Sequence, residues 1–346
     1  MTSLRFQDIT GRYGNLRIAV LGDFCLDRYL EIDPARSETS IETGLPVHNV
    51  INVRSQPGGA GTIVNNLAAL GIGTIWPVGL AGEDGEGYEL ERALAATPGA
   101  RLDHFIRTGE RRTFTYCKPL IIEPGKTPRE LSRLDQKNWT ATPQALSDRL
   151  SSALRSIAEN VDALILLSQV DEPETGVLTA AVLETARQLA AARPQMVIVA
   201  DSRRGLSGFP PVIYKMNAAE LAALTATNAA ACPASELRQI IQSASMLARQ
   251  NGRPVFVTLS ERGIVGASPD GQAEHIPARM MHGEIDIVGA GDAVTANLAA
   301  ALASGATLRE ALVLAEASAS VVIRQLGTTG SASIAQLRDA ATTPVA

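Results

Sequence analysis

The sequence predicts an α/β protein whose central, mostly parallel β-sheet is flanked by helices and carries a small inserted β-sheet lid. Short apolar runs alternate with longer helical patterns along most of the chain, which is typical of parallel strands joined by crossover helices. Two polar stretches with β-like alternation interrupt this order and favour a separate small sheet. We therefore expect one domain over residues 1–346, with lid insertions at about 31–55 and 103–122.

The expected strands are short apolar runs, and the expected helices lie between them. Arg17 to Gly22, which reads Arg-Ile-Ala-Val-Leu-Gly, opens the sheet as a buried strand. Ser260 to Gly263 forms a turn, and Ile264 to Ala267 is the hairpin partner of the strand before it. The other expected strands are Thr74 to Gly79, Ala163 to Ser168, Met196 to Ala200 and Val255 to Leu259. The main expected helices are Pro143 to Glu159, Glu174 to Ala192, Ala293 to Ala303 and Leu308 to Gln325.

The lid is predicted from two stretches without a helical period. The first alternates around Val47 to Val53, and the second contains Arg111 to Lys118, which alternates like an exposed strand. A flap of this kind can close over a substrate and exclude water. Its edges can also pair with a second subunit, so we expect a homodimer formed through the lid.

Composition limits the classes of binding partner and the cellular compartment that we expect for the protein. With 346 residues, 45% of them hydrophobic, and a net charge of -5, the chain can bury a large core but lacks the basic surplus that binds nucleic acid. No stretch approaches the roughly 20 apolar residues of a membrane span, and the N-terminal segment lacks the apolar run of a signal peptide. Cys25, Cys117 and Cys232 show neither disulfide nor zinc spacing. We expect a cytoplasmic protein that acts on a small molecule, without a nucleic acid or membrane partner.

The segment Asp286 to Asp292, Asp-Ile-Val-Gly-Ala-Gly-Asp, concentrates the most chemistry in the chain and precedes a predicted helix. Glycines before a helix let backbone N–H groups converge on an anion, and the helix N-terminus adds about half a positive charge. The carboxylate of Asp292 beside such a site suits a base that deprotonates a hydroxyl attacking a phosphoryl group. The alternative is a tight glycine turn with an acidic residue favoured by the helix dipole.

Carboxylates and glycines near other strand ends are candidates for binding a polar ligand. Ligands gather at the carboxyl ends of strands in open α/β sheets. Gly58 and Gly59 start an amphipathic helix without dinucleotide or P-loop spacing, so we expect their backbone to approach a neutral polyol. The alternatives are solvated loop acids and a plain tight turn. The candidate carboxylates are Asp23 and Asp27. Asp171 and Asp201 each follow another strand end.

Asn217 and Glu220 lie where a strand ends and a helix begins. Asn217 is the expected N-cap and Glu220 occupies the third helical position, which is a capping box. A capping box needs no ligand, so this pair alone supports a functional site only weakly.

In order and spacing, these segments resemble the PfkB (ribokinase-like) family of carbohydrate kinases. Asp286 to Asp292 looks like the family's Asp-Thr-x-Gly-Ala-Gly-Asp signature, Asn217 with Glu220 fits its Asn-x-x-Glu motif, and Thr258 to Gly263 resembles its nucleotide loop. The resemblance covers about residues 16 to 333 and implies a ribokinase-like fold and ATP-dependent kinase activity. The other matching segments are Gly22-Asp23 with Asp27, Pro57-Gly58-Gly59, and Gly79 to Gly87.

Within this family, the likeness is greatest to the heptose-phosphate kinase branch, the kinase half of the bifunctional ADP-heptose synthesis enzymes. The segments that carry it are Gly22 to Tyr29, Thr39 to Val47, Leu131 to Asp135 and His275 to Arg279. Thr62 stands where the family usually has asparagine, and Ser260 stands where it usually has glycine. Ser168 to Pro173 also differs from the Ser-Asp-Tyr-x-Lys-Gly of heptose kinases and lacks its lysine, which leaves open whether the sugar is already phosphorylated.

The resemblance implies a role for each candidate residue. Asp292 would be the base, while the N–H groups of Gly289, Ala290 and Gly291 would stabilise the transferring phosphoryl group. Residues implied to bind ATP are Asn217, Glu220, Thr258, Ser260 and Gly263. Residues implied to bind the substrate are Asp23, Asp27, Gly58, Gly59, Thr62 and Asp171.

The resemblance also implies the cofactors and the substrate class. Magnesium would be held through water near Glu220, and a monovalent cation such as potassium would bind at Asp286 and Val288. The substrate would be a sugar or sugar derivative, including one like heptose 7-phosphate. Two alternatives stay open, a nucleoside kinase of the same fold and a non-catalytic homologue that binds nucleotide or sugar.

Overall fold

A nine-stranded sheet forms the centre of the protein. The computed structural model describes residues 1–225, 233–280 and 283–342, so Cys232 lies outside the described residues. The strand order is β16-β15-β14-β13-β12-β11-β1-β6-β7, parallel from β14 to β7 and antiparallel at β15 and β16. The strands are β1 (Arg17–Gly22), β6 (Thr74–Gly82), β7 (Phe105–Thr108), β11 (Ala163–Ser168), β12 (Val197–Ser202), β13 (Ile213–Asn217), β14 (Val255–Thr258), β15 (Ile264–Ala267) and β16 (Ala273–Ile276).

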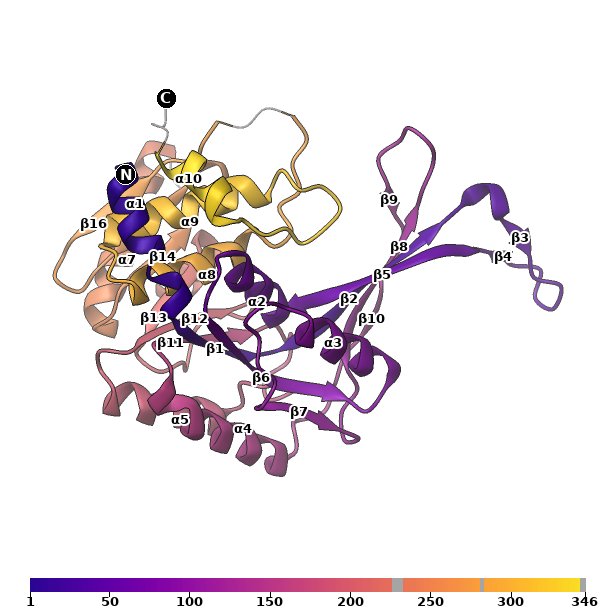
Figure 1. Ribbon diagram of the computed structural model, residues 1–346, viewed down its shortest axis with the longest axis horizontal. Coiled ribbons are helices and arrows are strands. Elements are labelled where there is room, and N and C mark those ends of the chain that lie inside the picture. Colours follow the sequence, from indigo (N-terminus) through magenta and orange to yellow (C-terminus); the bar gives the residue numbers. More distant parts are fainter. Residues whose placement is uncertain (226–232, 281–282, 343–346) are drawn as a thin grey trace.

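Helices cover both faces of this sheet (Figure 1). Because side chains alternate along a strand, Ile18 and Val20 of β1 join one core while Ala19 and Leu21 join the other. The first core is completed by α1 (Ser3–Thr10), α2 (Ala60–Ala69), α3 (Gly85–Ala95), α8 (Ala290–Ala303), α9 (Leu308–Val322) and α10 (Ile334–Thr342). The second is completed by α4 (Gln144–Ile157), α5 (Ala180–Ala192), α6 (Ala218–Thr225) and α7 (Pro233–Asn251). In the described ranges, no helix combines the length and apolar content needed to cross a membrane.

The lid is a second, five-stranded sheet that projects from one end of the body (Figure 1). Its strand β2 follows β1 after a single residue, pairs parallel with β8 and pairs antiparallel with β5. A small hairpin, β3 (Glu38–Thr39) with β4 (Pro46–Val47), forms its tip. The expected fold class is therefore confirmed. The lid strands are β2 (Phe24–Ile32), β5 (Val50–Gly59), β8 (Phe114–Ile121), β9 (Arg129–Glu130) and β10 (Leu134–Gln136).

The lid boundaries differ from the expected ranges. The lid begins at Phe24 rather than near residue 31, because β2 runs straight out of the main sheet. The range 103–122 is divided, because β7 pairs with β6 in the main sheet and only β8 belongs to the lid. Strand β8 is largely buried rather than exposed, because β2 and β10 flank it.

One predicted helix differs clearly from the observed one in its bounds, and some elements were not predicted. The helix expected from Glu174 begins at Ala180, since Glu174 has a left-handed backbone with φ 62° and Thr179 caps the helix. Strand β16 and helices α1, α7 and α10 were not predicted. The other main strands lie within a few residues of their expected positions.

Candidate active site

The residues of the predicted anion site lie at the start of α8. Gly289 is the N-cap with a left-handed φ of 82°, a conformation that glycine adopts without strain. Within the described part of the chain, the N–H groups of Gly289 and Gly291 have no hydrogen-bond partner, whereas that of Ala290 donates to the carbonyl of Ile287 at 3.3 Å. Two of the three predicted N–H groups are thus available for an anion.

Asp292 lies in the first turn of α8, directly beside these N–H groups. Its side chain is half-buried. Burial and the neighbouring carboxylate of Asp201 raise the pKa of Asp292 to about 7, against the opposing charge of Lys215. A carboxyl group that titrates near neutral pH is well matched to accept a proton from a hydroxyl.

A buried ion pair under the start of α8 was missed in the sequence. Lys215 Nζ donates to Asp201 Oδ2 at 2.7 Å, and Thr295 Oγ1 donates to the same oxygen at 3.0 Å. A Cβ at Gly291 would lie 3.1 Å from Lys215 Nζ, so the ammonium group sits against the anion site. The signal in the sequence was a lysine inside the strand Ile-Tyr-Lys-Met-Asn, where a buried cation needs a partner.

The ends of β13 and β14 carry the predicted nucleotide residues. Asn217 is paired in register with Thr258, so the two lie side by side. The expected capping box is present, because Glu220 N–H donates to Asn217 Oδ1 at 2.9 Å and Asn217 N–H donates to Glu220 Oε2 at 2.8 Å. Burial raises the pKa of Glu220. Their geometry is thus explained by capping, and their roles toward ATP and magnesium stay predictions.

Ser260 and Gly263 shape the turn between β14 and β15. Ser260 has a left-handed backbone with φ 53°, which explains why a glycine suits this position. Gly263 has φ 90°, and a Cβ there would lie 2.0 Å from the carbonyl oxygen of Ile276, so no other residue fits.

Replacing Ser260 with glycine is expected to raise the free energy of unfolding by up to about 1 kcal/mol, because relief of left-handed strain exceeds the added entropy of the unfolded chain. Urea unfolding of the variant measures this. A lower free energy of unfolding in the variant would show that the Ser260 side chain stabilises the protein by more than its left-handed backbone destabilises it.

The predicted sugar side lies where the lid joins the body. Asp27 is 4% exposed, and its Oδ1 lies 3.4 Å from the Nζ of the buried Lys118. Burial raises the pKa of Asp27 although Lys118 opposes this. A Cβ at Gly58 would lie 2.8 Å from Asp27 Oδ2, and one at Gly59 would lie 2.6 Å from the carbonyl oxygen of Asp23. These glycines therefore allow close packing within the protein, and contact with a polyol stays a prediction.

Both carboxylate oxygens of Asp23 accept hydrogen bonds from backbone N–H groups. The N–H of Gln169 donates to its Oδ2 at 2.8 Å, and the N–H of Val177 donates to its Oδ1 at 2.7 Å. Asp23 also lines a hollow at the base of the lid with Arg111 and Phe114. Because both oxygens hold the segment 169–177, this geometry favours a positioning role over the expected contact with sugar, which stays a prediction.

Of the two remaining predicted substrate residues, Thr62 is buried and Asp171 is exposed. Thr62 is 1% exposed on α2, and its hydroxyl has no partner among the described residues. Asp171 is exposed, and its Oδ2 accepts a hydrogen bond from Lys137 Nζ at 2.6 Å, which lowers the pKa of Asp171. Asp171 therefore lies at the rim, tied to the segment that follows the lid strand β10.

Asp286 organises the loops around the anion site. Its Oδ1 accepts from the N–H of Val288 at 3.0 Å, and its Oδ2 accepts from the N–H of Gly327 at 3.1 Å. Carboxylate oxygens keep further lone pairs, so this donor set still fits a monovalent cation. Among the described residues, no group of three or more His, Cys, Asp or Glu side chains could hold a metal ion.

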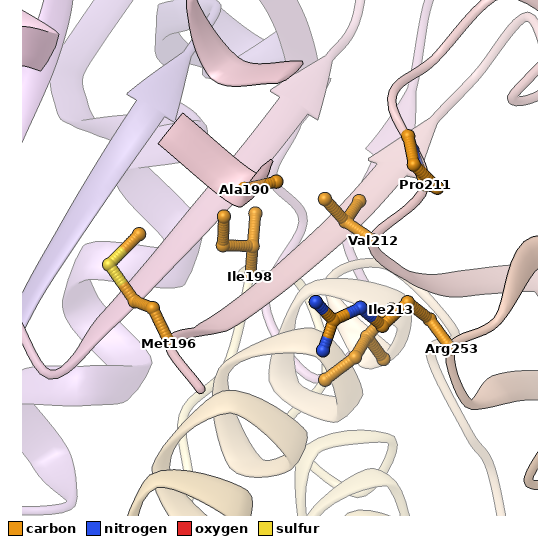
Figure 2. Close-up of a pocket in the computed structure, with 7 residues that line it drawn as sticks. All are labelled: Ala190, Met196, Ile198, Pro211, Val212, Ile213 and Arg253. Atoms are coloured by element: carbon orange, nitrogen blue, oxygen red, sulfur yellow. The ribbon is translucent and has the colours of Figure 1, made fainter. Parts of the chain in front are cut away.

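A small pocket, drawn in Figure 2, lies at the opposite end of the main strands from this site. It lies at the amino ends of β12 and β13, whereas Asp201 and Asn217 lie at their carboxyl ends. Ligands of open α/β sheets bind at the carboxyl ends. The pocket is lined by Ala190, Met196, Ile198, Pro211, Val212, Ile213 and Arg253.

Comparison with known proteins shows the family to which the chain belongs. The description "pfkB family carbohydrate kinase" matches residues 17–335. The chain belongs to this family. The resemblance stated from its motifs is therefore confirmed.

Curated relatives carry the name bifunctional protein HldE. That of Azorhizobium caulinodans is 32% identical over 312 residues, which cover 90% of this chain and 61% of the relative. That of Gluconobacter oxydans is 31% identical over 319 residues, which cover 92% and 62%. The chain thus spans about three fifths of the length of these relatives.

Solved structures share the fold. Arabidopsis thaliana ribokinase, complexed with ribose and ATP, is 19% identical with a TM-score of 0.63 and covers 94% of this chain and 97% of its own. Escherichia coli phosphofructokinase-2, in complex with fructose-6-phosphate, is 17% identical with a TM-score of 0.66 and covers 94% and 98%.

Proposed function

We propose that the protein transfers the γ-phosphoryl group of ATP to a hydroxyl of a sugar or sugar derivative, with Asp292 as the base. The observation that carries this proposal is the position of Asp292 beside the free N–H groups of Gly289 and Gly291. A binding site for an anion gains nothing from an adjacent carboxylate, whereas phosphoryl transfer needs both an anion site and a proton acceptor.

The chain's own residues divide the work. Asp292 accepts the proton of the attacking hydroxyl, and the N–H groups of Gly289 and Gly291 stabilise charge on the transferring group. Lys215 adds a fixed positive charge against Gly291, held in place by Asp201. The nucleotide occupies the ends of β13 and β14, beside Asn217, Glu220, Thr258, Ser260 and Gly263.

Two cations complete the proposed site. Glu220, whose Oε1 is not used in the capping box, would hold magnesium through water, and this cation would neutralise charge on the ATP phosphates. The Asp286 carboxylate and the Val288 carbonyl would hold potassium where two loops meet.

The finer substrate proposal is a sugar like heptose 7-phosphate. The HldE relatives and the sequence likeness to heptose kinases support it. Three cationic side chains also surround the Tyr116 ring. Arg203 donates to the Tyr116 hydroxyl at 3.0 Å and pairs with no carboxylate among the described residues, while Arg133 and Lys137 lie over the ring. Arg203 could therefore pair with a substrate phosphate.

Activity is expected to rise with pH through about 7. Asp292 must be deprotonated to accept a proton, and its pKa is raised to about 7, so protonation at lower pH removes the base. A kcat/KM profile measured from pH 5 to 9 should lose about tenfold for each unit below this pKa and level off above it. A profile that is flat between pH 5 and 8 would contradict the assignment.

One screen tests the proposed function. ADP release from ATP is measured by a coupled assay with hexoses, pentoses, heptose phosphates and nucleosides. We expect at least one sugar or sugar phosphate to stimulate release. Stimulation by nucleosides alone would make the chain a nucleoside kinase, and ATP binding without stimulation by any compound would indicate a non-catalytic homologue.

We also propose a cytoplasmic homodimer joined through the lid. The lid exposes large apolar side chains, with Ile41 100% and Ile51 52% exposed, and β5 is an edge strand. A second copy would cover them. Cys25 and Cys117 are free thiols, as expected for a cytoplasmic protein.

A further inference from the structure

A chain of polar side chains leads from Asp27 along the lid. Lys118 Nζ lies 3.4 Å from Asp27 Oδ1 and donates to the Tyr29 hydroxyl at 3.3 Å. The same hydroxyl accepts from Gln56 Nε2 at 3.5 Å, the longest link. Lys118 and Tyr29 are both less than a tenth exposed, so solvent competes little with these contacts.

Gln56 carries the chain from the lid to the body. Its Nε2 also donates to Thr329 Oγ1, and its Oε1 accepts from Thr328 Oγ1 at 3.1 Å. Gln56 lies on β5 of the lid, whereas both threonines lie in the loop between α9 and α10. A single side chain thus fastens the lid to this loop through both ends of its amide.

The loop between α9 and α10 touches the anion site. A Cβ at Gly289 would lie 3.4 Å from Thr329 Cβ, so the loop packs directly against the N-cap of α8. Asp286 ties the N–H of Gly327 in this loop to the N–H of Val288 before the N-cap. A displacement of Thr329 would therefore shift Gly289, which carries one of the predicted anion-site N–H groups.

We infer that Lys118, Tyr29 and Gln56, with Thr328 and Thr329, form a lid relay that positions the anion site according to how the lid sits over Asp27. The relay residues are positioning residues and touch neither ATP nor the reacting atoms. With the sugar held at Asp27, the lid fixes Gln56, Gln56 fixes Thr328 and Thr329, and the loop fixes Gly289. Misplacement of the anion site by a fraction of an ångström weakens charge stabilisation without removing a catalytic group. The kinetic part of this inference rests on the proposed function.

Hydrogen exchange tests the relay without requiring turnover. The Gln56→Leu variant keeps the side-chain size and loses both amide contacts. We expect faster amide exchange in residues 286–292 and 327–331 than in the unmodified protein. The control is Asn52→Ala on the same strand. The exposed Asn52 side chain donates, among the described residues, only to Glu31 at 3.0 Å, so this substitution should leave both segments unchanged. Unchanged exchange in both segments of Gln56→Leu would overturn the inference.

Kinetics of a double-mutant cycle test the connection along the relay. Gln56→Leu and Tyr29→Phe are each expected to lower kcat for the sugar about tenfold, with KM for ATP changed less than about twofold. The double variant should lose little more than either single one, whereas independent sites would give about a hundredfold loss. Additive losses would overturn the relay. If the unmodified protein shows no sugar-dependent ADP release, the proposed function fails, and the exchange experiment still decides the relay.

Discussion

Replacing Asp292 with asparagine is expected to lower sugar-dependent turnover by about 10²–10⁴-fold, because the variant keeps the shape of the side chain but loses the proton acceptor. ATP affinity should change little, since loss of a negative charge beside the phosphates removes repulsion rather than a contact. A coupled ADP-release assay and a nucleotide titration measure the two quantities.

The matched control is Asp148→Asn on α4. Asp148 is exposed and, within the part of the chain that the structure describes, its side chain accepts a hydrogen bond only from Gln144 at 2.9 Å. Its substitution should therefore leave turnover and ATP binding unchanged. Turnover of Asp292→Asn equal to that of the control would end the assignment of Asp292 as the base.

Replacing Lys215 with methionine is expected to damage both activity and stability. Turnover should fall by about 10²–10³-fold, because a fixed positive charge beside Gly291 is lost from the anion site. The free energy of unfolding should fall by about 3–5 kcal/mol, because the buried carboxylate of Asp201 loses its ion-pair partner. Steady-state kinetics and denaturant unfolding measure these effects separately.

A second substitution separates the two roles of Lys215. The double variant Lys215→Met with Asp201→Asn removes the uncompensated charge, so we expect it to regain most of the lost stability. It should not regain turnover, because the positive charge is still absent. Recovery of turnover together with stability would show that Lys215 acts only on folding.

Much of the fold could be predicted from the sequence because several central strands of the main sheet are buried apolar runs. β1, β11 and β15 have the bounds that their apolar runs indicate, since each is buried along almost its whole length. Helix α7 was not predicted although it has 19 residues. Only one helix, the one capped by Asn217, was expected between β13 and β14, whereas the chain forms two there. β7 was assigned to the lid because nothing local distinguishes a short edge strand of one sheet from a strand of another.

The arrangement of the candidate site could be predicted from the sequence where its residues are close neighbours along the chain. Gly289, Gly291 and Asp292 are contiguous, so their arrangement follows from the start of one helix. The pair of Asp201 and Lys215 depends instead on the register of two parallel strands, in which Ala200 lies beside Tyr214. No spacing along the chain reveals that register.

Long-range backbone contacts account for the remaining differences. The expected contact of Asp23 with sugar stays a prediction, but the sequence does not indicate that N–H groups 146 and 154 residues later donate to its oxygens. Gln56 was not predicted to have a functional role, because its partners Thr328 and Thr329 are 272 and 273 residues away in the sequence. Such contacts appear only once the sheet and the lid are assembled.

The most direct measurement of the central claim is transfer of a radiolabelled γ-phosphoryl group from ATP to the sugar found in the screen. The account predicts that the label appears on the sugar with the unmodified protein and stays on ATP with Asp292→Asn, although both bind ATP. Equal labelling of the sugar by both proteins, or no labelling by either, would contradict it.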